Sequence, residues 1–418
     1  MSRESASAPG EFREGWKLVL AASFGFSFFS VMMAGTGLFM QPLGDEFGWS
    51  RTLLSSGPSI ATIMTAILGP FFGAMIDRFG SRRLALPGIV VTMASISAFS
   101  LLNGETWQWI ALWFTFGVVS VSIKSTIWTA AVVGAFERSR GLALGLTLSG
   151  TAVAQSIVPP LGNLLIDAFG WRMAFVCLGL GWGSITLLLA WLFLHEARRT
   201  RLQAANQAQP GHLPATGGLT VRAALRDRAL WQLAVSNFLI MALTMGLTIH
   251  LFPILTEAGV SREKAALLTA LSGVAGIAGK LVTGYLLDRF RPNFVGGATL
   301  GAAAAGFALL INDVASPALI VIALLVNGYA AGTKTHITGY LTAGYAGMRN
   351  FGAIYGFMSA LMSLAAGVGP LLAGAAYDMS GGYEPFLIAG AAGCVLGGLL
   401  IIVMPPVREW TGERDERS

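Results

Sequence analysis

Hydrophobic residues run through the chain in twelve long stretches, separated by short polar or glycine-containing segments. Each stretch reaches about 20 residues, the length that an α-helix needs to cross the hydrocarbon core of a bilayer. Because a backbone surrounded by lipid must satisfy its own hydrogen bonds, the stretches predict helices. They lie at residues 17–40, 53–76, 84–102, 107–133, 142–166, 173–194, 229–256, 264–287, 294–312, 317–341, 350–377 and 384–404.

One long polar segment, residues 195–228, divides these stretches into two groups of six. Its Gln, Asn and Gly content cannot bury much apolar area, so we expect a flexible connector with room for one surface helix. We therefore predict an all-α membrane protein of twelve transmembrane helices. Its parts are an N-terminal tail (1–16), a six-helix bundle (17–194), a linker (195–228), a second six-helix bundle (229–404) and a C-terminal tail (405–418).

The composition agrees with a membrane protein and excludes a soluble enzyme. Hydrophobic residues make up 54% of the chain and charged residues 11%, whereas about a quarter of the residues of a soluble protein are charged. Both cysteines lie inside apolar stretches, which argues against a disulfide framework or a metal cluster. Because no phosphate-binding loop or nucleophile motif stands out either, we expect no catalytic residue, no cofactor and no bound metal.

The net charge of +6 follows from membrane topology rather than from a nucleic-acid partner. The loops after the second, fourth, sixth, eighth and tenth stretches hold fourteen Lys and Arg residues, and the opposite loops hold four. Positively charged loops stay in the cytoplasm. We therefore expect both termini to be cytoplasmic and the chain to lie in the cytoplasmic (inner) membrane.

Landmark residues recur between the two groups at a nearly constant offset, which indicates an internal repeat. The offset is 210 or 211 residues for four pairs: Asp77 and Asp288, Lys124 and Lys334, Pro160 and Pro370, and Asp167 and Asp378. Two pseudo-symmetric bundles joined by a cytoplasmic linker form the architecture expected for alternating access around a central site.

The segment after the second stretch resembles a family signature. Gly73-Ala-Met-Ile-Asp77-Arg78-Phe79-Gly80-Ser81-Arg82-Arg83 is similar, almost position for position, to the loop 2–3 motif of the major facilitator superfamily. The segment Gly284-Tyr-Leu-Leu-Asp288-Arg289-Phe290 resembles the degenerate copy of that motif in the second half of the family's members. The resemblance covers the whole chain and implies the major facilitator fold.

In that family, ion pairs made by the motif hold the cytoplasmic gate closed. Anchoring by positive charge would explain the arginines but not the aspartate within a glycine-spaced motif. The resemblance therefore implies gating roles for six residues: Asp77, Arg78, Arg82, Arg138, Asp288 and Arg289.

Residues 39–51 and 140–150 resemble the monocarboxylate transporter and oxalate/formate antiporter branches of this superfamily. In these branches a helix 8 arginine four residues before a glycine binds the substrate carboxylate; here Lys280 precedes Gly284 at that spacing. Lysine keeps the charge but loses the bidentate fork of arginine. Proton-coupled animal members carry an aspartate one turn earlier, where this chain has Gly276. Some bacterial members place a helix 7 histidine near the substrate, a role that His250 fits.

Ionisable residues inside the predicted helices point to a transport path, because they are costly in lipid unless they line a cavity. All 21 acidic residues lie in loops, tails or helix ends, whereas Lys124, Lys280 and Lys334 lie within stretches, together with His250 and His336. A basic cavity without acidic partners either loses protons or takes up an anion. We therefore expect a small organic anion as the cargo.

Lys124 lies about eleven residues, or roughly 16 Å, from the cytoplasmic end of its helix, which is too deep for snorkelling. Lys334 lies about seven residues, or roughly 10 Å, from the end of its helix, so snorkelling competes with a cavity role. Lys280 could instead be a structural residue of the cytoplasmic gate.

Two further groups complete the candidate site. His250 either contacts the substrate or bonds to backbone carbonyls that Pro253 frees. Tyr329 is one of several aromatic residues that could form walls of the site, although such residues also pack between helices. His336 lies on another helix face than Lys334, and we expect it to pack against a neighbouring helix.

We therefore expect a monomeric secondary transporter of small organic carboxylates in the lipid bilayer. The branch resemblance favours proton-coupled monocarboxylate symport, with the proton as a second partner. Carboxylate exchange of the oxalate/formate type and dicarboxylate transport are the alternatives. An efflux pump for anionic compounds and a nutrient sensor on a transporter scaffold fit the sequence less well.

Overall fold

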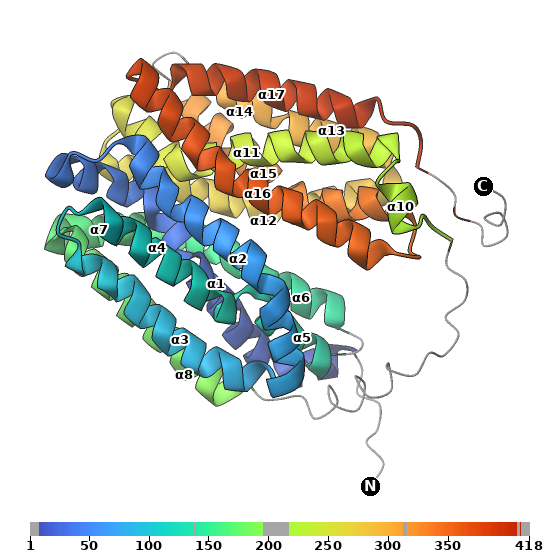
Figure 1. Cartoon of the computed structure of the whole chain (residues 1–418), viewed down its shortest axis with the longest axis horizontal. Helices are drawn as coiled ribbons and strands as arrows, with labels where there is room; N and C mark the ends of the chain where they lie inside the picture. Colours follow the sequence, from blue (N-terminus) through green and yellow to red (C-terminus); the bar gives the residue numbers. More distant parts are fainter. Residues whose placement is uncertain (1–7, 137–138, 195–216, 312–315, 408–409, 411–418) are drawn as a thin grey trace, which may run out of the picture. The chain divides into compact units, whose positions relative to one another are not determined.

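The structure, a computed structural model, describes residues 8–136, 139–194, 217–311, 316–407 and 410 (Figure 1). These residues are nearly all helical and contain no strand, with one isolated backbone bridge between Gly218 and Gly347. The prediction of an all-α protein is confirmed.

The helices gather into two compact units. Unit 1 comprises residues 1–48 and 60–210, and unit 2 comprises residues 49–59 and 211–418. Residues 49–59 differ from the predicted division of the chain. They include the beginning of α2, a helix of the N-terminal half, but belong to unit 2.

The helices of unit 1 begin and end close to the hydrophobic stretches. They are α1 (Ala8–Phe47), α2 (Arg51–Phe79), α3 (Ser81–Ala98), α4 (Thr106–Ser120), α5 (Ser125–Ala135), α6 (Arg140–Leu148), α7 (Gly150–Val176) and α8 (Gly183–Phe193). Gly170, with φ of 78° and ψ of 164°, breaks α7 into two helices. A positive φ of this kind suits glycine, which lacks a Cβ. A π-helical segment, Cys177–Trp182, joins α7 to α8.

Unit 2 contains the remaining helices. They are α10 (Val221–Ala224), α11 (Arg228–Glu257), α12 (Arg262–Arg289), α13 (Pro292–Gly301), α14 (Ala303–Ala308), α15 (Pro317–Ala346), α16 (Phe351–Ser380) and α17 (Glu384–Ile402). The end of the predicted linker is anchored in this unit, because Leu219 N donates to Ala346 O at 2.8 Å. The rest of the linker, residues 195–216, lies outside the described residues.

Ten helical segments within the described part of the chain are long and apolar enough to span a membrane. One of them, Gly141–Phe193, is 53 residues long and turns at Gly170, so it accounts for two spans. The predicted ninth span is divided into α13 and α14 at Ala302, which makes each piece too short to qualify alone. With these two cases resolved, the described helices account for the twelve predicted spans.

Small residues hold α12 and α15 unusually close. A Cβ at Gly279 would lie 2.4 Å from Tyr329 O, and a Cβ at Gly332 would lie 2.1 Å from Gly276 O. Close approach at glycine is a common way to pack membrane helices, which gain little from the hydrophobic effect. These contacts fix the two helices that carry three of the predicted substrate-binding residues.

Candidate functional site

Lys124 lies at a break in its transmembrane helix. α4 ends at Ser120, a 3₁₀ turn covers Val121–Ile123, and α5 begins at Ser125. Lys124 itself is extended, with φ of −65° and ψ of 165°. The sequence predicts one continuous helix over 107–133, so this part of the prediction is wrong. Irregular backbone at membrane depth is tolerated where it is buried in protein or lines a cavity.

Local sequence and one indole explain how the break is accommodated. Val121, Ile123 and Ile127 are β-branched, and such residues lower helix propensity slightly. The Trp128 indole donates to Ile123 O at 2.7 Å, which satisfies a carbonyl beside the break. Trp128 is fully buried, and α1 approaches it through Gly25, whose Cβ would lie 2.0 Å from the indole ring.

The Lys124 ammonium faces α2 within unit 1. Its Nζ donates to Thr65 O over a long distance of 3.4 Å, and a Cβ added to Gly69 would lie 3.8 Å from Nζ. Neither neighbouring group carries a negative charge, and the side chain is half-buried. A desolvated ammonium with one weak neutral acceptor retains capacity to bind an anion.

Lys334 is the most deeply buried of the predicted lysines, with 5% of its surface exposed. Its Nζ donates to Thr244 Oγ1 of α11 at 2.7 Å, and this hydroxyl in turn donates to Ile240 O at 2.6 Å. The contact is to a hydroxyl and not to a carboxylate. Unlike its repeat mate Lys124, Lys334 lies within a continuous helix, α15.

Lys280 and Tyr329 lie on the closely packed helices α12 and α15. Lys280 is half-buried, and Thr283, one turn further along α12, donates to the Tyr329 hydroxyl at 2.9 Å. His336, also on α15, is exposed. Lys280 of α12 therefore lies on the same helix pair as Tyr329 and His336 of α15.

His250 is fully buried in a polar network of unit 2. Its Nε2 contacts Pro370 O at 3.1 Å and Ser55 Oγ at 2.8 Å, and its Nδ1 contacts the Tyr383 hydroxyl at 2.9 Å. Because a carbonyl oxygen can only accept, Nε2 carries a proton, and Nδ1 of the neutral ring accepts from Tyr383. Burial raises the pKa of Tyr383, so the phenol keeps the proton that it donates.

Sequence reasoning missed the polar residues at the beginning of α2, which belong to unit 2. Asp378 accepts hydrogen bonds from Arg51 N at 2.9 Å and Thr52 N at 2.8 Å, so it caps this helix from a distant part of the sequence. Arg51 Nη2 also pairs with Glu257 Oε1 of α11 at 2.9 Å. All three charges lie in loops predicted on the same side of the membrane, which is the signal that could have linked them.

The predicted gating residues are described only in part. Arg82 donates from both Nη atoms to carbonyls at the end of α8, Leu194 O at 2.6 Å and Trp191 O at 2.8 Å. Arg78 and Arg289 each lie over an aromatic ring near them in sequence, at 5.3 Å and 4.7 Å. Arg138 and the side chains of Asp77 and Asp288 lie outside the described residues, so their gating roles stay predictions.

The fold and these buried polar groups define a multi-pass α-helical membrane protein with cations inside its spans. Residues 20–313 and 251–417 match the sequence profile of the Major Facilitator Superfamily. The chain belongs to this family of transporters, as the loop 2–3 motif predicts.

Two curated relatives and one solved structure are similar to this chain over most of its length. The chain is 26% identical to monocarboxylate transporter 11 of Mus musculus over 407 residues, which cover 94% of this chain and 87% of that protein. It is 25% identical to a gallate transporter of Pseudomonas putida over 388 residues, covering 81% and 84% of the two chains. Among solved structures, it is similar in fold to a bacterial homologue of the human lysosomal transporter Spinster, with a TM-score of 0.70, 16% identity and coverage of 96% and 97%.

Proposed function

We propose that the chain is a secondary active transporter that moves small organic carboxylates across the cytoplasmic membrane by alternating access. The observation that carries the proposal is the set of three lysines within transmembrane helices: Lys124, Lys280 and Lys334. Charges at this depth are retained where they serve transport. A substrate carboxylate would supply the negative charge that the ammonium contacts of Lys124 and Lys334 lack.

The helix break at Lys124 supports the anionic charge of the substrate. α5 begins at Ser125, so its first backbone N–H groups and the positive end of its dipole lie next to the lysine. Discontinuous helices of transporters use such half-helix N-termini toward anionic substrate groups. The lysine and the helix beginning would attract the same carboxylate.

The assignment of substrate class rests on charge and on the relatives together. Both relatives are named for carboxylates, and the spans of this chain hold lysines, whose charge attracts carboxylates. We assign Lys280 and Lys124 to the carboxylate oxygens and Lys334 to a second polar group, with Tyr329 as a wall. His250, whose ring nitrogens are both engaged, would tune the site by holding Ser55 and Tyr383 in place.

For coupling we propose proton symport, with exchange of carboxylates as the second candidate. The branch resemblance implies an aspartate at the position of Gly276 in proton-coupled members, and a Cβ added to Gly276 would lie 3.3 Å from Gly328 O. A larger side chain there would crowd the backbone of α15, which would have to shift by a few tenths of an ångström. The proton would therefore travel on the substrate or on a lysine or histidine rather than on a helix 8 aspartate.

The contacts at the beginning of α2 lie on the side of the membrane that the arginine distribution assigns to the exterior. We propose a role for them in an outer gate. Arg51, Asp378 and Glu257 join this segment to α11 and α16 within unit 2, while the rest of α2 belongs to unit 1. We propose that these contacts form when the outer side closes and release when it opens.

The decisive experiment measures uptake of labelled mono- and dicarboxylates by the purified protein in proteoliposomes. Symport predicts uptake driven by an inward proton gradient with empty vesicles. Exchange predicts indifference to the gradient and dependence on internal carboxylate. Lys124→Ala and Lys280→Ala should each abolish uptake while the protein remains abundant and folded in the membrane. Normal uptake by both variants would remove the site assignment, and absence of flux for any anion would favour a sensor.

A further inference from the structure

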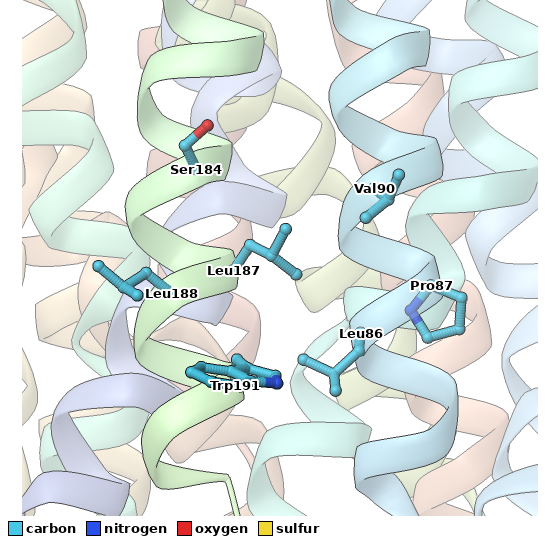
Figure 2. Close-up of a pocket in the computed structure, with 7 residues that line it drawn as sticks. All are labelled: Leu86, Pro87, Val90, Ser184, Leu187, Leu188 and Trp191. Atoms are coloured by element: carbon cyan, nitrogen blue, oxygen red, sulfur yellow. The ribbon is translucent and has the colours of Figure 1, made fainter.

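A groove opens on unit 1 between α3 and α8 (Figure 2). Its volume is about 520 Å³, and its lining is apolar apart from the hydroxyl of Ser184 and the indole N–H of Trp191; the other lining residues are Leu86, Pro87, Val90, Leu187 and Leu188. Leu187 and Trp191 reach from α8 toward Leu86 on α3. Several of these side chains are well exposed; Trp191, for example, has 59% of its surface uncovered. A volume of this size accommodates a small ligand rather than a single solvent molecule.

Basic side chains gather at one end of the groove. Arg82 lies one turn before Leu86, and its guanidinium is fixed by the carbonyls of Leu194 and Trp191 at the end of α8. The neighbouring Arg83 is exposed, and Lys17 of α1 lies 5.7 Å from the centre of the Phe193 ring. Arg82 and Lys17 thus lie at the end of α8, whose Trp191 also lines the groove, and Arg83 follows Arg82 directly in the chain.

The combination matches the chemistry of an anionic phospholipid. An acyl chain fills an apolar groove on a transmembrane surface, and clustered arginines and lysines bind a phosphate group. The arginine distribution places this end of α3 on the cytoplasmic side, where anionic lipids concentrate and basic pockets between helices bind their headgroups. We propose that the α3–α8 groove binds one anionic phospholipid, with its acyl chain against Trp191 and Leu86 and its phosphate at Arg82, Arg83 and Lys17.

Trp191 provides a direct probe, because bromine atoms on an acyl chain quench a nearby indole. The full-length protein is reconstituted in phosphatidylcholine vesicles that contain either brominated phosphatidylglycerol or the same mole fraction of brominated phosphatidylcholine. The Trp191 signal is the difference between the wild-type protein and Trp191→Phe. We expect Trp191 to show about a fivefold preference for the anionic lipid, the effect of roughly one cation near the membrane surface.

Matched variants separate the two parts of the proposal. Trp107, which is 64% exposed at the beginning of α4, serves as the control indole and should show no headgroup preference. The double variant Lys17→Gln/Arg83→Gln should lower the preference at Trp191, and Val90→Phe, which fills the groove from an exposed position, should reduce quenching by both lipids. Equal quenching of Trp191 by the two lipids in wild-type protein, or an undiminished preference in the double variant, would overturn the proposal.

Discussion

Replacing Lys334 with methionine separates a role in substrate binding from a role in stability. Methionine has a similar length and is apolar, so it removes the charge without leaving a large cavity. The substitution abolishes the hydrogen bond that Nζ donates to Thr244 Oγ1 at 2.7 Å. Thr244 still donates to Ile240 O at 2.6 Å, so its hydroxyl keeps a partner.

We expect Lys334→Met to maintain or increase the free energy of unfolding but to decrease the affinity for carboxylate. A buried charge carries a desolvation cost of several kcal/mol, so its removal should leave the free energy of unfolding unchanged or increased. A hydrogen bond from a charged group to a substrate contributes about 1.5–3 kcal/mol, which corresponds to roughly a 10- to 150-fold loss of affinity. The variant should therefore be at least as stable as the wild-type protein and bind carboxylate far more weakly.

Two measurements test this prediction: thermal unfolding in detergent, with and without carboxylate, and initial uptake rates in proteoliposomes. Lys264→Met makes the same change at an exposed position at the beginning of α12 and should leave both measurements unchanged. Wild-type uptake and wild-type stabilisation by carboxylate in Lys334→Met would refute a substrate contact. A large loss of stability would show that Lys334 serves the packing of α11 and α15 instead.

Three further changes test the packing and the proposed gate. Gly279→Ala should lower the free energy of unfolding by about 1–3 kcal/mol, because the new methyl group overpacks the contact between α12 and α15. The control is Gly284→Ala on the same helix, which should be neutral or slightly stabilising because no atom lies within 4 Å of the new Cβ. Equal unfolding midpoints for the two variants would contradict the close approach of the helices. Trp128→Phe removes the donor to Ile123 O and should cost about 1–3 kcal/mol in the free energy of unfolding, so an unchanged midpoint would mean that water satisfies this carbonyl. Glu257→Gln breaks a partly exposed ion pair and should lower the free energy of unfolding by at most about 1 kcal/mol, and this difference from the wild-type protein should shrink in high salt. A larger loss of stability that does not depend on salt would indicate a structural role in place of a gate.

The sequence determined the fold class because the bilayer imposes a simple rule. A backbone in lipid must be helical and a span must reach about 20 apolar residues, so hydropathy alone locates the helices. The loop motif around Asp77 and the repeated offset then pointed to the superfamily. Depth within the spans identified Lys124, Lys280 and Lys334 as unusual without any knowledge of their neighbours.

What surrounds each charge depended on tertiary structure. Lys124 and Lys334 are repeat mates by sequence, yet Lys124 lies at a helix break and Lys334 in an unbroken helix. Helix propensity differs too little along these segments to predict the break, which also needs a buried indole to satisfy the freed carbonyl. Glu46 and Glu257 are likewise 211 residues apart, but Glu46 pairs with Arg172 and Glu257 with Arg51.

Partners of this kind are chosen by the packing of helices that are distant in sequence. His250 meets Ser55, which is 195 residues away, and Asp378 caps a helix more than 300 residues before it. The hydrophobic pattern fixes where each helix crosses the membrane, because that depends on the transfer free energy of each segment by itself. It does not fix which side chains meet inside the bundle, because small residues and polar contacts between helices decide that arrangement.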